Sequence, residues 1–388
     1  MWAVIALLGL VAVSCKQDAV FYIISTETAP QKPRIEGGPT NIVVFKDIMY
    51  VASGRLHWYA KAEGAEKPQW DSGQYNIKQP KGKISALAAT SDRLYAASWD
   101  NASIQYIEAA GDAFTRISAG PIQTIYADSE KPLLFAGVGS RNSYDIFYLD
   151  NDDTLKPLIR NTSLLSGVVN RDGYYYLSTE GDGIWRVNET NNSIDEGSIL
   201  QLTDTDATGK KLFMSMIKLE DIDNTIIAVE RNRGTLYEVG TDIEGDCYEK
   251  MRYIDINNNN DIETDKYAMR ALALWEDSQD STRRALVASI QGTLYNTTTS
   301  SHTYGYVEFD LKDGSIDKSF ARRDPGKLRS VEDNDRYMTS IGKYPINHLF
   351  QAPKNIDPDM TFFASTQTVG LWSYRDRKDG GWQWNAEE

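Results

Sequence analysis

Residues Ile84–Tyr106, with the sequence ISALAATSDRLYAASWDNASIQY, contain the pattern that decides the fold. They consist of an apolar strand, a polar turn, a second strand ending in small residues, a short hairpin and a third, alternating strand. The same pattern recurs along the chain, so an internal repeat organises it. One position near the end of each predicted second strand marks the repeats: Ser53, Ser98, Gly137, Ser178, Glu230, Ser289 and Ser365.

The gaps between these positions are 45, 39, 41, 52, 59 and 76 residues. A period of about 40–50 residues with four short strands is typical of a β-propeller blade, because one such sheet buries its faces only by packing against neighbours around an axis. We therefore expect an all-β fold, a β-propeller of seven four-stranded blades within residues 41–388. The long last gap leaves eight blades as the alternative, with Asp335–Gly342 as a strand of the extra blade. Ala19–Thr26 is a predicted strand that can pair with the last blade and close the ring.

The composition of the 388 residues restricts the partners. Hydrophobic residues make up 41% of the chain, which suits a large core, and the net charge is -14. Phosphate binding needs a concentrated basic face, and none is visible. The sequence therefore predicts no nucleic-acid partner and an acidic, solvated surface.

The N-terminal stretch MWAVIALLGLVAVSC is too short to span a bilayer as a helix but has the length of a secretory signal. Its end, Ala12–Cys15, resembles the lipobox of bacterial lipoproteins, in which the cysteine is acylated and becomes the mature N-terminus. The resemblance implies a signal peptide over residues 1–15, lipidation at Cys15, an N-terminal strand and linker over residues 16–40, and attachment to a membrane of the cell envelope on its periplasmic or surface side. An ordinary cleaved signal, an uncleaved anchor and a buried strand are the alternatives.

From Asn41 to Glu388 the strand pattern resembles bacterial envelope propellers of the broad WD40, NHL and quinoprotein-like group. In known propellers, the hairpins between second and third strands and the links between blades emerge on one face. The long segments of this chain belong to these two classes, so we expect a binding face for a protein or a glycan there. Exposed aromatic residues and arginines anchor such interfaces. The hairpin residues expected to ring the channel mouth are Trp99, Asp100, Arg141, Asn142, Glu180, Asp182, Arg231, Arg233 and Gln291.

One segment has the spacing of a metal site. Asp255, Asn257, Asn259 and Asp261 match positions 1, 3, 5 and 7 of a calcium loop, although Lys266 occupies position 12, where a bidentate glutamate is usual. Calcium is the one cofactor that the sequence suggests. A polar surface loop that joins two blades is the alternative.

Catalytic signatures are weak. The histidines His57, His302 and His348 lie in no HExxH or GxSxG context. The leading hypothesis is therefore a non-catalytic, lipid-anchored propeller that presents its binding face to an envelope protein or an external ligand. The alternative is a propeller enzyme, a glycan hydrolase or lyase or a metal-dependent lactonase, in whose channel Glu230 replaces the serine of most repeats. A calcium-stabilised structural spacer is a third possibility.

Overall fold

The computed structural model describes residues 34–73, 75–140, 143–150, 152–204, 211–220, 222–231, 235–240, 247–250, 254–255, 260–261, 267–293, 305–312, 315–322, 341, 344–377 and 381–387. They belong to the compact unit Pro33–Glu388, whereas Met1–Lys32 is a separate unit. The predicted lipidation site Cys15 and the predicted strand Ala19–Thr26 lie outside the described residues. Within the described part of the chain, no helix is long and apolar enough to cross a membrane.

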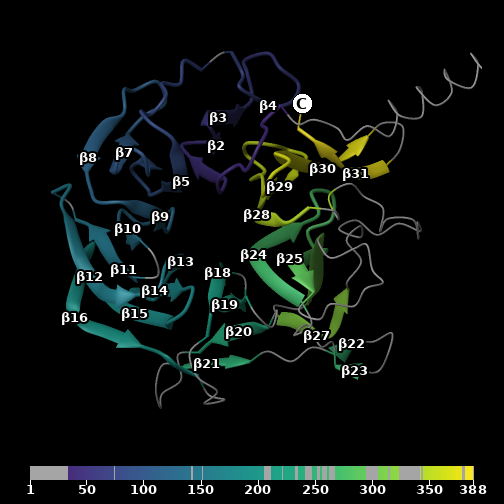
Figure 1. Cartoon of the computed structure of the whole chain (residues 1–388). Helices are drawn as coiled ribbons and strands as arrows, with labels where there is room; N and C mark the ends of the chain where they lie inside the picture. Colours follow the sequence, from purple (N-terminus) through teal and green to yellow (C-terminus); the bar gives the residue numbers. More distant parts are fainter. Residues whose placement is uncertain are drawn as a thin grey trace, which may run out of the picture. The chain divides into compact units, whose positions relative to one another are not determined.

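The strands form seven blades around a central axis, so the fold is a seven-bladed β-propeller, as predicted (Figure 1). Each blade is an antiparallel meander whose first strand lies nearest the axis. Blade 1 consists of β1 (Val43–Phe45), β2 (Ile48–Ser53), β3 (Arg55–Ala60) and β4 (Gln69–Trp70), and blade 2 of β5 (Ile84–Ala89), β6 (Leu94–Ser98), β7 (Ser103–Ile107) and β8 (Thr115–Ser118). Blade 3 consists of β9 (Ile122–Ala127), β10 (Leu134–Ser140), β11 (Ser143–Leu149) and β12 (Leu155–Thr162), and blade 4 of β13 (Leu165–Arg171), β14 (Tyr174–Thr179), β15 (Gly183–Thr190) and β16 (Ser193–Gln201).

The later blades carry the additions to this plan. A short strand, β17, pairs in parallel with the outermost strand of blade 5, and a two-stranded hairpin, β22–β23, follows that blade. Blade 5 consists of β18 (Phe213–Leu219), β19 (Thr225–Glu230), β20 (Leu236–Val239) and β21 (Cys247–Lys250), with β17 (Thr203–Asp204) added at its edge, and the hairpin is β22 (Ile254–Asp255) and β23 (Asn260–Asp261). Blade 6 consists of β24 (Tyr267–Glu276), β25 (Arg284–Thr293), β26 (Gly305–Lys312) and β27 (Ser315–Arg322). Blade 7 consists of β28 (Ile346–Gln351), β29 (Phe362–Thr366), β30 (Leu371–Arg377) and β31 (Gly381–Ala386).

The core is divided among the blade interfaces. Seven clusters of buried apolar side chains occur, and each joins one blade to the next. Alternate residues of a second strand therefore face opposite neighbours. In β6, Leu94 and Ala96 pack towards blade 1, whereas Tyr95 and Ala97 pack towards blade 3. Apolar residues at successive positions in these strands follow from burial on both faces.

The cluster between blades 6 and 7 decides the number of blades. Trp275 and Tyr306 of blade 6 pack in one cluster with Phe362 and Trp384 of blade 7, and the Tyr306 and Trp384 ring centroids are 5.8 Å apart. This direct contact leaves no space for an eighth blade. The segment Asp335–Gly342 lies outside the described residues except for Ile341, which is fully buried in the same cluster.

The ring closes between blades 7 and 1. Phe363 of β29 packs edge-on against Tyr59 and Trp70 of blade 1, with ring centroids 5.3 and 5.6 Å away. The segment before β1 crosses to blade 7, where the Ile35 carbonyl accepts a hydrogen bond from the Leu371 N–H (3.0 Å). Gly37 forms an isolated parallel bridge with Val369. The described contacts therefore join the N-terminal end of the propeller to its last blade.

Side-chain amides fasten neighbouring segments at four places. Each amide donates to the carbonyl and accepts from the N–H of a single residue, so it replaces a missing strand partner. Two of these amide clamps join the innermost segments of adjacent blades. The two between adjacent blades are the Asn41 side chain with the main chain of Leu87 and the Gln351 side chain with the main chain of Glu276. In the other two, the Gln79 side chain bonds the main chain of Leu56 and the Gln105 side chain bonds the main chain of Lys81.

Candidate functional site

The hairpin between β6 and β7 carries the most exposed aromatic residue of the predicted binding face. The Trp99 side chain is 53% exposed, and the Lys83 ammonium lies 5.9 Å from its ring centroid. Among the described residues, only Trp99 and Leu200 are large hydrophobic residues in the exposed class. A contact with a lysine side chain does not remove the indole from solvent, so Trp99 is available to a partner.

The neighbouring side chains hold this hairpin in place. Asp100 accepts hydrogen bonds from the Ser98 hydroxyl (2.6 Å) and the Lys83 N–H (2.8 Å). These two donors, the hydroxyl first, lower the pKa of the Asp100 carboxyl. At Gly82, where φ is +87°, a Cβ atom would lie 2.4 Å from the Ser98 hydroxyl oxygen. Glycine therefore permits the close approach that braces the Trp99 hairpin.

The corresponding hairpin of blade 4 uses Asp182 in the same way. Its carboxylate accepts hydrogen bonds from the Ser163 N–H (2.8 Å), the Ser163 hydroxyl (2.7 Å) and the Thr162 hydroxyl (3.2 Å). Asp100 and Asp182 thus tie second-to-third-strand hairpins to the start of their own blades, a local structural role. Burial and, to a smaller extent, the charge of half-buried Glu180 raise the pKa of the Tyr126 phenol of β9.

The other residues of the predicted face are distributed as follows. Arg231 follows β19 and is exposed, and its main-chain N–H donates to the Leu212 carbonyl (2.8 Å). Only the main chain of Gln291 is described, within β25. Arg141, Asn142 and Arg233 lie outside the described residues. The described exposed anchors are therefore Trp99 and Arg231.

Glu230 faces a different neighbour from Ser289 and Ser365, with which the repeat pattern aligned it. Ile226 and Ala228, which share its face of β19, pack in the cluster between blades 4 and 5, so Glu230 points towards blade 4. Ser289 and Ser365 face the following blade, where their hydroxyls donate to the Ile346 (3.1 Å) and Thr40 (3.0 Å) carbonyls. Glu230 is 5% exposed and accepts a hydrogen bond from the Tyr237 hydroxyl at 3.2 Å.

The two described histidines have structural partners. His57 Nδ1 lies 2.9 Å from the Asp71 carboxylate, and burial lowers the pKa of its ring although Asp71 opposes that shift. On innermost strand β28, His348 Nδ1 accepts a hydrogen bond from the Ile42 N–H of blade 1 (3.3 Å), and burial lowers its pKa to about 4. His302 lies outside the described residues.

The predicted calcium ligands fall partly within the described chain. Asp255 and Asp261 lie in β22 and β23, which pair as a short hairpin, whereas Asn257 and Asn259 lie outside the described residues. Among the described residues, no three His, Cys, Asp or Glu side chains come together closely enough to hold a metal ion. The calcium site stays a prediction.

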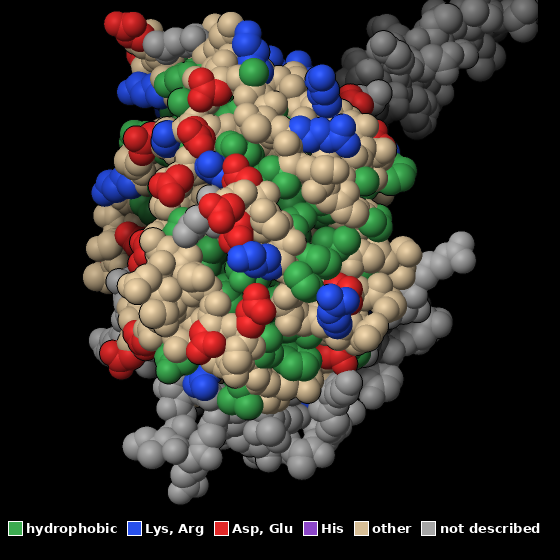
Figure 2. All heavy atoms as spheres, turned by 90° about the vertical axis from the view of Figure 1, so that its left-hand side faces the viewer, with side chains coloured by type: hydrophobic (Ala, Val, Ile, Leu, Met, Phe, Trp, Pro, Cys, Tyr) green, Lys and Arg blue, Asp and Glu red, His purple; other side chains and the backbone are tan. Residues whose placement is uncertain are grey.

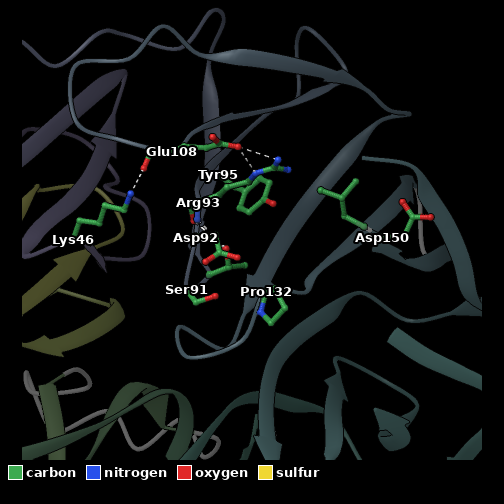
Figure 3. A pocket seen from close by; sticks show the side chains of 10 residues that line it. Lys46, Ser91, Asp92, Arg93, Tyr95, Glu108, Pro132 and Asp150 are labelled. Carbon is green, nitrogen blue, oxygen red and sulfur yellow. Dashed lines mark hydrogen bonds and ion pairs between the residues drawn. The ribbon is translucent and has the colours of Figure 1, made fainter. Parts of the chain in front are cut away.

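A charged groove that the sequence analysis missed lies between blades 2 and 3 (Figure 3). Its volume is about 450 Å³, and half of its ten lining residues are charged. Arg93 stacks on the Tyr106 ring (4.0 Å to the centroid) and forms ion pairs with Glu108 (3.0 Å) and Asp153 of blade 3. Lys46 donates to the Glu108 carbonyl. Because these contacts depend on residues up to 62 positions apart, no local pattern indicated them.

Charge is dispersed over this part of the surface. Figure 2 shows acidic and basic side chains interspersed on the side of the propeller that contains β8, β12 and β16. The outward charges of this side are therefore typical of a solvated surface rather than of a site for one polyanion or polycation.

Known proteins share the architecture but little sequence. No family model and no curated protein matches the chain. A structure of YCF48 bound to D1 peptide has a TM-score of 0.50 at 10% identity, over 90% of this chain and 96% of that one. Virginiamycin B lyase from Staphylococcus aureus has a TM-score of 0.52 at 11% identity (88% and 96%), and the Niastella koreensis GH74 enzyme 0.53 at 13% (91% and 55%). These likenesses show that the fold is a β-propeller.

Proposed function

We propose that the protein is a binding propeller that presents the face around Trp99 to a protein partner. The observation that carries the proposal is the exposed Trp99 on a hairpin braced by Asp100 and Gly82. A rigid, exposed aromatic residue gives up little conformational entropy on binding, and aromatic residues and arginines dominate the energy of interfaces. Arg231, exposed at the corresponding end of β19, is the second anchor.

The similar structures allow both of the function classes considered. One is a propeller bound to a peptide, and two others are a lyase and a GH74 enzyme by their names. The enzyme alternative requires carboxylates that face the channel, and Glu230 instead faces blade 4. This placement favours binding over channel chemistry, with a glycan as a second ligand class because sugar rings also stack on tryptophan.

Testing this function needs substitutions that leave the fold intact. We expect Trp99→Ala combined with Arg231→Ala to weaken partner binding at least tenfold in pull-down and titration, since about 1–2 kcal/mol is lost per anchor. The control is Lys354→Ala together with Glu130→Ala, which changes two exposed residues of first-to-second-strand turns at the opposite strand ends. Unchanged affinity in the Trp99 and Arg231 variant would refute the proposed face, and binding only to glycan arrays would identify the second ligand class.

The proposal includes attachment of the propeller to an envelope membrane through a lipid on Cys15. The lipobox-like end of the apolar N-terminal stretch supports it. We expect Cys15→Ser to abolish incorporation of an alkyne-labelled fatty acid and to move the protein from the membrane fraction to the soluble fraction. Cys247→Ser is the control. Fatty-acid labelling that survives in Cys15→Ser would contradict the assignment.

A further inference from the structure

A second pocket lies at the central axis, between the innermost strands β1, β5, β9 and β28. Its volume is about 400 Å³, within the range of about 300–1,000 Å³ that is usual for small-molecule sites. The links β9–β10 and β28–β29 contribute to its wall through Ser129 and Pro353. First-to-second-strand links lie at the opposite strand ends from second-to-third-strand hairpins, so the pocket and Trp99 are on opposite faces of the propeller.

The lining of this axial pocket is unlike the rest of the surface. None of its twelve lining residues is charged, although 25% of the chain is. In the groove between blades 2 and 3, by comparison, half of the lining residues are charged. The half-buried side chains that line the axial pocket are Asn41, Val43, Val44, Tyr126, Ala127, Phe350 and Pro353.

The polar side chains that line the pocket, Asn41, Tyr126 and Ser129, are neutral. Burial raises the pKa of Tyr126 to about 12, so its phenol keeps the proton. The His348 ring stacks against Phe350 (6.3 Å between centroids), and its Nδ1 accepts a hydrogen bond, which assigns the proton to Nε2. A ligand here meets aromatic faces and neutral hydrogen-bonding groups. A charged ligand would lose its hydration without gaining an ion pair with the lining residues.

We propose that the axial pocket binds a small, uncharged molecule with an aromatic ring, packed against Tyr126 and Phe350. Aromatic rings gain about 0.5–1.5 kcal/mol from offset or edge-to-face contacts beyond the area that they bury. The uncharged lining selects against carboxylates and amines of the same size. This site is independent of the protein-binding face, because it lies at the other end of the strands.

The probes are naphthalen-2-ol and naphthalene-2-carboxylate, which share a ring system but differ in charge at pH 7. In isothermal titration with the full chain, we expect the naphthol to bind at least tenfold more tightly than the carboxylate. Ala127→Phe fills the pocket and should weaken naphthol binding at least tenfold. Ala110→Phe, which adds the same bulk in the exposed turn after β7, should leave it unchanged. If Ala127→Phe does not fold, Val44→Phe serves as the second filling variant.

Three results would overturn the site. The first is equal affinity of the chain for naphthalen-2-ol and naphthalene-2-carboxylate. The second is naphthol binding that neither filling variant weakens, although the variant has the melting temperature of the unmodified chain. The third is equal affinity for naphthalen-2-ol and its saturated analogue decahydronaphthalen-2-ol. The last would show an apolar pocket without aromatic selectivity. Each leaves partner binding at Trp99 untouched, so the failure of this proposal is distinguishable from failure of the proposed function.

Discussion

Phe363→Ala is expected to lower the free energy of unfolding by about 3–5 kcal/mol, the usual cost of truncating a fully buried phenylalanine. Phe363 is completely buried at the junction of blades 7 and 1, where it contacts Tyr59 and Trp70. A closed propeller has one such junction between its first and last blades, so a cavity there weakens the contact that completes the ring. Urea denaturation followed by tryptophan fluorescence measures the loss.

Phe114→Ala is the matched control, because Phe114 is half-buried beside the cluster between blades 1 and 2. The same truncation there should cost about 1–2 kcal/mol, in proportion to the smaller area removed from water. Equal losses for the two variants would mean that the junction between blades 7 and 1 is not packed as described.

Gln351→Glu is expected to cost about 2–4 kcal/mol at pH 7. The Gln351 amide nitrogen donates to the Glu276 (2.7 Å) and Met360 (3.1 Å) carbonyls, and its oxygen accepts from the Glu276 N–H (2.8 Å). A carboxylate of the same shape keeps the acceptor but loses both donors and places its charge against two carbonyl oxygens. Each buried group left unsatisfied costs about 1–3 kcal/mol.

Gln367→Glu makes the same chemical change at an exposed position in the turn after β29. Its free energy of unfolding should stay within about 0.5 kcal/mol of the unmodified chain, as for most surface substitutions. If Gln351→Glu proves equally harmless in urea denaturation, the amide clamp between blades 6 and 7 does not contribute to stability.

The architecture was predictable because its signal is local and repeated. The run Leu94–Ser98 and its counterparts recur at nearly constant spacing, and burial on both faces explains their continuous apolar character. Glu230 faces the preceding blade, whereas Ser289 and Ser365 face the following one, although the repeat pattern aligned all three. Neighbouring residues of a strand point to opposite faces, so a shift of one residue moves a side chain from one blade interface to the other.

The candidate site was less predictable because side-chain partners distant in sequence decide it. Asp100 is exposed, and its carboxylate also accepts a hydrogen bond from the Lys83 N–H, which the sequence did not indicate. The Gln351 clamp joins residues 75 positions apart, and the Arg93–Asp153 pair joins residues 60 positions apart. Repeat patterns carry no information about such pairs, whereas the exposure of Trp99 followed from its place in a hairpin.

The most direct test of the proposed binding face is photo-crosslinking in cells that naturally express the full chain. The substitutions Trp99→p-benzoylphenylalanine and Lys354→p-benzoylphenylalanine place the same reactive group at opposite ends of the strands, and both parent residues are exposed. We expect one discrete protein adduct from position 99 and none from position 354. An adduct from position 354 alone, or none from either position, would contradict the proposed binding face.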